Sequence, residues 1–129
     1  MKTPVQVVEE FCRALSDGPD GLRQALRQWF TPDTVWINTG IMTTTGIEEA
    51  LALVGQFEER AGIAAIQIDI KAIAADHNKI LTERVDHMIN SSGERIKSDL
   101  VMGIFEVEGE RIVAWRDYFD SAAALSPSH

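Results

Sequence analysis

The sequence predicts an α+β domain in which helices come first and a meander of strands follows. Apolar residues recur at helical spacing through residues 3–30, whereas after residue 65 they alternate with polar residues, as in strands. Hairpin-length turns separate these later strands, so sequential neighbours should be antiparallel. Such a sheet can curl around the helices and leave a pocket that is closed at one end. With 129 residues, the chain should form a single domain over its whole length.

Two helices are expected before residue 31. Thr3 and Gln6 match a capping box that opens the first helix, and Gly18 is the expected left-handed residue at its end. Asp20 can cap the second helix, which residues 31–33 (TPD) should terminate. The expected buried stripe of this second helix consists of Leu22, Leu26, Trp29 and Phe30.

A short strand over residues 34–39 comes next, with Trp36 and Asn38 on one face. A second capping box beginning at Thr45 predicts a third helix that ends at Gly62. The remaining strands are expected at residues 66–71, 80–90, 100–107 and 111–120. Residues 121–129 are predicted to be a flexible tail.

Composition and charge narrow the range of partners. The formal net charge is −8, and the 12 lysines and arginines do not cluster, which argues against binding to nucleic acid or anionic lipid. No apolar run approaches the length of a membrane span, and the N-terminus lacks the apolar core of a signal peptide. The single cysteine, Cys12, excludes an internal disulfide and fits a cytoplasmic location.

Asp117 is the first candidate for chemistry. It shares one face of the last strand with Val113, Trp115 and Phe119, because strand side chains alternate. A carboxylate buried among them must be paired or hydrogen-bonded, and its pKa is then open to adjustment. The structural alternative is an aspartate at a strand end that accepts bonds from backbone N–H groups.

Arg84 and Asp86 share a face of an earlier strand, about 7 Å apart along it. If this face and that of Asp117 line one pocket, the arginine can hold both carboxylates, leaving one acid neutral and the other ionised. Asn38 can then accept a proton of a bound water, and Trp36 can donate one hydrogen bond. An ion-pair network that only braces the sheet is the alternative.

Two stretches, residues 83–86 (ERVD) and 115–120 (WRDYFD), resemble the two signature segments of the limonene epoxide hydrolase family. The intervals between them and the aromatic-x-Asn stretch at residues 36–38 (WIN) are also similar to those of the family. The resemblance implies a nuclear-transport-factor-like (SnoaL-like) fold. In this fold a cone-shaped, curved mixed sheet wraps around the helices and leaves a deep apolar pocket. One pairing of strands in the sheet is not antiparallel.

The resemblance also implies one-step hydrolysis of a small apolar or cyclic epoxide to a vicinal diol, without metal or organic cofactor. Asp117 would be the base that activates water, Asp86 the acid that protonates the epoxide oxygen, and Arg84 the bridge between them. Asn38 would hold the water. Trp36 departs from the pattern, because the family has a tyrosine there.

Other interpretations remain open for the function and for several residues. An isomerase or cyclase would use Asp117 to remove a proton next to a carbonyl, and a third possibility is a non-catalytic dimer that binds small ligands. Met88 either lines the pocket or fills the core. His87, on the opposite face from Asp86, should face solvent or a partner subunit. The apolar outer face that contains Tyr118 predicts a homodimer.

Overall fold

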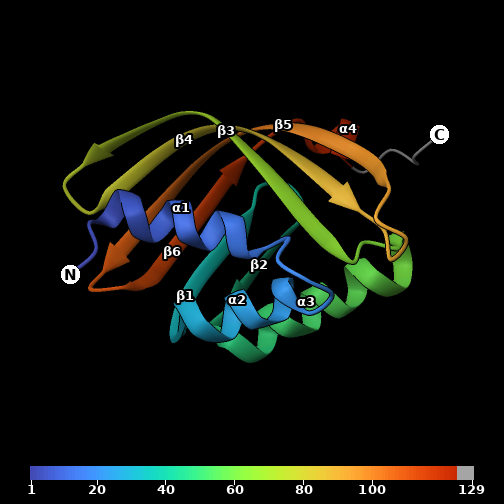
Figure 1. Ribbon diagram of the computed structural model, residues 1–129, viewed down its shortest axis with the longest axis horizontal. Helices are drawn as coiled ribbons and strands as arrows, with labels where there is room; N and C mark the ends of the chain where they lie inside the picture. Colours follow the sequence, from blue (N-terminus) through green and yellow to red (C-terminus); the bar gives the residue numbers. More distant parts are fainter. Residues whose placement is uncertain (125–129) are drawn as a thin grey trace.

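A curved six-stranded sheet arches over three helices, which lie on its concave side (Figure 1). The computed structural model describes residues 1–124. Its helices are α1 (Pro4–Ala14), α2 (Gly21–Trp29), α3 (Gly46–Ala61) and α4 (Ser121–Ala124). Its strands are β1 (Phe30–Asn38), β2 (Met42–Thr45), β3 (Ala65–Asp76), β4 (Lys79–Ile89), β5 (Arg95–Glu108) and β6 (Arg111–Tyr118).

The strand order is β2-β1-β6-β5-β4-β3, and the pairing of β1 with β6 is parallel while every other pairing is antiparallel. The predicted α+β class and the one exception to antiparallel pairing are therefore confirmed. The parallel pair places Trp36 beside Trp115 and Asn38 beside Asp117. This topology brings the first strand of the chain against the last one, so residues far apart in sequence share one inner face.

The helix boundaries confirm some of the predicted caps and correct others. The Thr3 capping box is present, and Gly62 ends α3 in the left-handed conformation. Gly18 is also left-handed (φ 76°), but α1 already ends at Ala14 with Leu15 as its cap. The side chains of Asp20 and Thr45 occupy N-cap positions without making the capping bond.

Other hydrogen bonds are present at these two helix starts. The Asp20 carboxylate accepts a long side-chain bond from Gln24 (3.5 Å). At α3, the carboxylate of Glu49 accepts the backbone N–H of Thr45 (2.9 Å), so this N–H is satisfied one residue later than a capping box requires.

Irregular strand pairing accounts for two strands, β1 and β3, whose predicted ranges are too short. β1 begins at Phe30, so this residue belongs to the strand and not to the stripe of α2, and residues 31–33 continue the strand where a break was predicted. The pairing with β6 shifts register between Phe30 and Val35, and such an irregularity accommodates Pro32. In β3 a shift between Ile70 and Ala72 interrupts the alternation that identified this strand.

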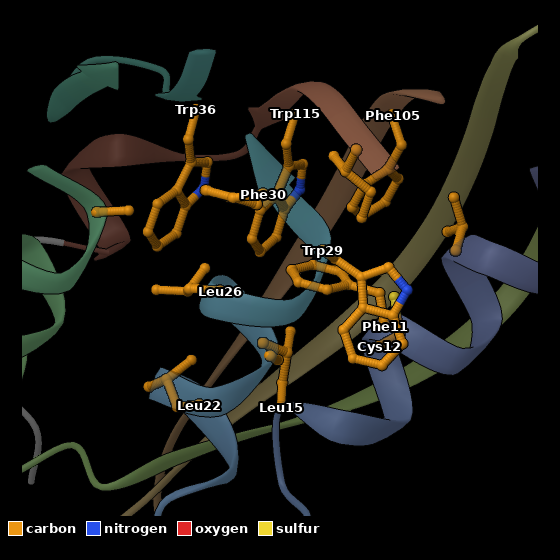
Figure 2. Packing of buried hydrophobic residues seen from close by; sticks show 14 of the residues in the cluster. Phe11, Cys12, Leu15, Leu22, Leu26, Trp29, Phe30, Trp36, Phe105 and Trp115 are labelled. Atoms are coloured by element: carbon orange, nitrogen blue, oxygen red, sulfur yellow. The ribbon is translucent and has the colours of Figure 1, made fainter. Parts of the chain in front are cut away.

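The core between the sheet and the helices is rich in aromatic side chains (Figure 2). Trp36, Trp115 and Phe105 form a row across β1, β6 and β5. The two indoles stack at 4.8 Å between ring centroids, and Phe105 stacks on Trp115 at 5.2 Å. Phe11 of α1 contacts this row edge-on through Trp115. The row fixes both indoles at the inner face of the sheet.

The C-terminal segment that was predicted as a tail begins with a short helix, α4, in which Asp120 accepts the backbone N–H of Ala123 (3.1 Å). The rest of that predicted tail, residues 125–129, lies outside the described residues. Within the described part of the chain, none of the helices has the length and apolar character needed to cross a membrane.

Candidate active site

A buried arginine joins two buried aspartates at the centre of the inner face. Arg84 donates from Nε and Nη2 to the two oxygens of Asp86 (3.0 and 2.7 Å). It donates from Nη1 and Nη2 to the two oxygens of Asp117 (3.0 and 2.9 Å). Its remaining N–H bonds Thr82 (3.1 Å), so all five guanidinium donors are used. The arrangement predicted for these three ionisable residues is therefore present.

The strand register makes room for this arrangement. Gly103 of β5 lies between Thr82 of β4 and Asp117 of β6, and its carbonyl accepts the Thr82 hydroxyl (2.9 Å). A Cβ at Gly103 would overlap Arg84 Nη1 and Asp117 Oδ1. The missing side chain leaves the space that the guanidinium and the Asp117 carboxylate occupy over β5.

Asp117 is buried and accepts several hydrogen bonds. Besides the two bonds from Arg84, its Oδ1 accepts the indole N–H of Trp115 (2.7 Å). Three of about four acceptor positions on the carboxylate are thus occupied, and the one left is on Oδ2. Burial raises the pKa of Asp117 above that of an ordinary carboxyl group, although Arg84 and the Trp115 bond act in the opposite direction.

Trp36 and Asn38 lie on the neighbouring strand, where Asn38 pairs with Asp117 and Trp36 pairs with Trp115. Trp36 Nε1 and Asn38 Nδ2 are buried and have no hydrogen-bond partner among the described residues. Buried polar atoms of this kind indicate a position for water or ligand. Rotation of the Asn38 amide exchanges its donor for its acceptor, so the pair can offer one N–H and one carbonyl oxygen to a water molecule beside Asp117.

A pocket of about 630 Å³ is bounded by both carboxylates and by Trp36 and Asn38. Most of its lining is apolar, as predicted, and includes Trp36, Phe57, Ile66, Met88, Val101, Trp115 and Phe119. Asn38, Asp86 and Asp117 supply polar groups at its wall. Every residue that sequence reasoning assigned to catalysis or water binding except Arg84 lines the pocket directly, and Arg84 is fully buried behind the two carboxylates.

Sequence reasoning missed several residues of the site. Thr82 accepts a hydrogen bond from Arg84, and the indole of Trp115 donates one to Asp117. Gly103 leaves space for both ionised groups. Lys97 and Asp99 also line the pocket, from the part of β5 that precedes the predicted strand. Extending the alternation of inner and outer residues in β5 back toward the hairpin that joins it to β4 would have placed Asp99 opposite Asp86.

His87 and Tyr118 lie on the other face of the sheet, outside the pocket. His87 was expected to face solvent or a partner, but it is only 8% exposed in the single chain. Its two ring nitrogens bond Ser98 (2.7 Å) and Asp69 (2.9 Å) of the neighbouring strands, which accounts for its burial. Tyr118 is 48% exposed, as a residue on the sheet surface should be.

Comparisons with known proteins point to one family. The model of the limonene-1,2-epoxide hydrolase catalytic domain matches residues 2–128. The chain is 36% identical over 88 residues to epoxide hydrolase EphG of Mycobacterium tuberculosis (strain ATCC 25618 / H37Rv), a match that covers 68% of this chain and 56% of that protein. The chain therefore spans little more than half of that relative.

Solved structures share the fold. A limonene-epoxide-hydrolase-like epoxide hydrolase of M. tuberculosis superimposes with a TM-score of 0.73 at 29% identity, over 93% of this chain and 80% of that one. A protein with a ketosteroid isomerase-like fold from Catenulispora acidiphila DSM 44928 gives a TM-score of 0.76 at 19% identity, over 98% and 94% of the two chains. At that lower identity the likeness concerns the fold alone.

Proposed function

Because the chain belongs to the limonene-1,2-epoxide hydrolase family, we propose that it adds water to a small epoxide and releases a vicinal diol. The observation that carries this proposal is the pair of buried carboxylates, Asp86 and Asp117, held by one guanidinium at the wall of a mainly apolar pocket. Epoxide opening needs a base for the water and an acid for the oxygen that leaves carbon. One such pair supplies both.

In the proposed reaction Asp117 takes a proton from a water molecule, and the water oxygen attacks an epoxide carbon. As the carbon–oxygen bond breaks, protonated Asp86 gives its proton to the departing oxygen. Asp117 ends protonated and Asp86 ionised, and return of one proton to Asp86 restores the starting state. Arg84 contacts both carboxylates throughout, so the change of charge stays within one hydrogen-bonded unit.

Trp36 and Asn38 would orient the water. In this arrangement the water gives one proton to Asp117 and the other to the Asn38 carbonyl oxygen, and it accepts the Trp36 N–H. One lone pair remains free for attack. The buried, unpaired Nε1 of Trp36 supports this role. The indole would replace the donor that the family's tyrosine provides at the same residue position, with its N–H at a different place from the phenol hydroxyl.

A single turnover in heavy-oxygen water tests this mechanism. With enzyme in excess over epoxide, label should appear in the diol at once and none should enter the protein. Direct attack by water is expected because Arg84 and Trp115 occupy three acceptor positions of Asp117, which weakens this carboxylate as a nucleophile. Diol and peptide masses over residues 113–120 give the measurement.

Covalent catalysis would give the opposite labelling pattern. If Asp117 attacked carbon and formed an ester, the first diol would carry no label and Asp117 would acquire it. Label on this residue would refute the direct mechanism while leaving hydrolysis intact. Absence of diol from a panel of epoxides would refute the function itself. An isomerase or cyclase, the alternative that the shared fold raises, has no use for the second carboxylate that Arg84 holds.

We also propose that the chain forms a homodimer through the outer face of the sheet. Val85, Leu100, Met102 and Tyr118 are neighbours there on β4, β5 and β6, and Leu100 is 78% exposed. Light scattering at micromolar concentration should give the mass of a dimer. Leu100→Glu together with Met102→Glu should give a monomer, because burial of two added charges opposes association. A monomeric unmodified protein would refute the proposal.

The cytoplasmic location of the protein stays a prediction.

A further inference from the structure

A third carboxylate lies beside the proposed acid. The register of β4 and β5 places Asp99 directly opposite Asp86, and both residues line the pocket. Opposite side chains of an antiparallel pair have Cβ atoms about 4.5–5.5 Å apart, so the two carboxylates are close neighbours on the inner face of the sheet. The Asp99 side chain is 16% exposed and that of Asp86 is 7% exposed, so solvent screens their charges poorly. The hydrolysis proposed above gives Asp99 no role.

The two carboxylates differ in their partners. Arg84 donates one hydrogen bond to each oxygen of Asp86, at 3.0 and 2.7 Å. Asp99 lies near the ammonium group of Lys97, whose Nζ is 3.9 Å from Asp99 Oδ1. Burial raises the pKa of Asp99, Lys97 opposes this shift, and the nearby charge of Asp86 adds to it. Because repulsion between two charges is mutual, Asp86 and Asp99 resist being ionised together.

The proposed hydrolysis needs its proton on one particular carboxylate. Asp86 must be protonated while Asp117 is ionised, although burial raises the pKa of Asp117. Arg84 donates two hydrogen bonds to each of them, so the guanidinium does not by itself decide which one holds the proton. The residues opposite them on β5 do differ. Asp99 lies opposite Asp86, whereas Gly103, which has no side chain, lies opposite Asp117.

We infer that Asp99 is a positioning residue for the reaction proposed above: its negative charge holds the proton on Asp86 until the epoxide oxygen takes it. The inference rests on the proposed function, because only a general acid at residue 86 needs such a bias. An ordinary aspartate has lost its proton at neutral pH, and a general acid must still hold one there. A like charge beside a carboxyl group is a common way to keep that group protonated.

The other groups around the pair do not supply this bias. They are two cations, a thiol and an apolar side chain, which come from β5, α3, α1 and β3: Lys97, Arg60, Cys12 and Ile68. The cations favour the ionised form of a nearby carboxyl group. The thiol is neutral at pH 7, because burial raises the pKa of Cys12 to about 12. Asp117 and Asp86 repel each other equally, so their mutual repulsion does not decide which of them holds the proton.

The pH dependence of kcat/KM tests the inference. Asp99→Asn removes the charge and keeps the size of the side chain. The alkaline limb of the profile, where the acid loses its proton, should move to lower pH by about one pH unit in this variant, the scale of a like charge at such a distance. KM, and kcat at pH values below that limb, should change little. A structural disturbance would instead lower kcat at every pH and leave the limb in place.

Two further variants serve as controls. Asp99→Glu keeps the negative charge and should return the alkaline limb to the pH of the unmodified enzyme. Glu108→Gln removes one negative charge from an exposed position of the same strand and should leave the limb unchanged. An alkaline limb that stays in place or moves to higher pH in Asp99→Asn would overturn the inference and leave the proposed hydrolysis standing.

A second measurement does not depend on turnover. Carbon-13 NMR follows the titration of the aspartate carboxyl groups, and the Asp99 signal is the one that is missing from Asp99→Asn. This signal should titrate at lower pH in Asp86→Asn than in the unmodified protein, because the charge of residue 86 is gone. If it does so but no epoxide is opened, the coupling of the two carboxylates is supported and the hydrolase function is refuted. If the titration of Asp99 is the same in both proteins, the inference is wrong.

Discussion

Asp117→Asn is expected to lower epoxide turnover by about 10²–10⁴-fold, the usual contribution of a general base. The amide keeps the shape of the carboxylate but cannot take a proton from water. It also presents N–H donors toward Arg84, whose donors already point at this position. Leaving such buried groups unpaired should lower the free energy of unfolding by about 1–3 kcal/mol, which still permits a folded protein that circular dichroism can verify.

The pH dependence of turnover distinguishes the loss of a catalytic base from a general disturbance of the structure. Turnover by the unmodified enzyme should rise with pH as Asp117 ionises, at a pH above that of an ordinary carboxyl because burial raises its pKa. The Asn variant should lose this acidic limb. Asp120→Asn is the matched control, since Asp120 is exposed and caps α4, and Asn caps helices equally well. Retention of activity within a few-fold in Asp117→Asn would remove this residue from the role of base.

The parts of the fold that could be predicted from sequence are those set by local pattern. Alternation located β4 and β6 within a residue or two, and it placed Arg84, Asp86 and Asp117 on faces that meet in the structure. The parallel pairing of β1 with β6 has no local signal, because it joins segments about eighty residues apart. Only the resemblance to a known family indicated that one pairing would differ.

The errors arose where backbone geometry departs from the repeating pattern. The register shift near Pro32 hid the start of β1, and the shift after Ile70 hid the second half of β3. The start of β5 was missed because the charged residues Lys97 and Asp99 do not look like the buried side of a strand. Those residues line the pocket. The predicted site lacked them because they are charged although they lie on the inner side of a strand, where apolar residues are expected.

No sequence pattern identifies Gly103 as a special position, but the packing around it requires a glycine. A glycine in the interior of a strand weakens the strand, unless another group occupies the space of its side chain. Here the guanidinium of Arg84 and the carboxylate of Asp117 occupy it, with Arg84 Cζ 3.3 Å from where a Cβ would lie. The backbone of this residue is not left-handed, so the requirement for glycine comes from packing and not from conformation.

Gly103→Ala should therefore displace the bridge between the two carboxylates. A shift of about 1 Å in such groups can cost about 10²-fold in kcat, while KM should change little because the apolar lining of the pocket stays in place. Overpacking should also lower the free energy of unfolding by about 1–3 kcal/mol, measured by urea denaturation. Raised kcat, or kcat equal to that of the unmodified enzyme, would show that Arg84 and Asp117 adapt to the added methyl group.

Gly55→Ala provides the matched comparison. Gly55 lies within α3, and among residues 1–124 no atom lies within 4 Å of its added Cβ beyond its chain neighbours and the backbone of its own helix. Alanine there should stabilise the protein by about 0.5–1 kcal/mol, since glycine is unfavourable inside a helix. The same chemical change should thus raise stability at residue 55 without altering kcat, and lower both stability and kcat at residue 103. If stability rises in Gly55→Ala and falls in Gly103→Ala, the loss at residue 103 comes from the space that the Arg84–Asp117 bridge occupies, because both variants add the same methyl group.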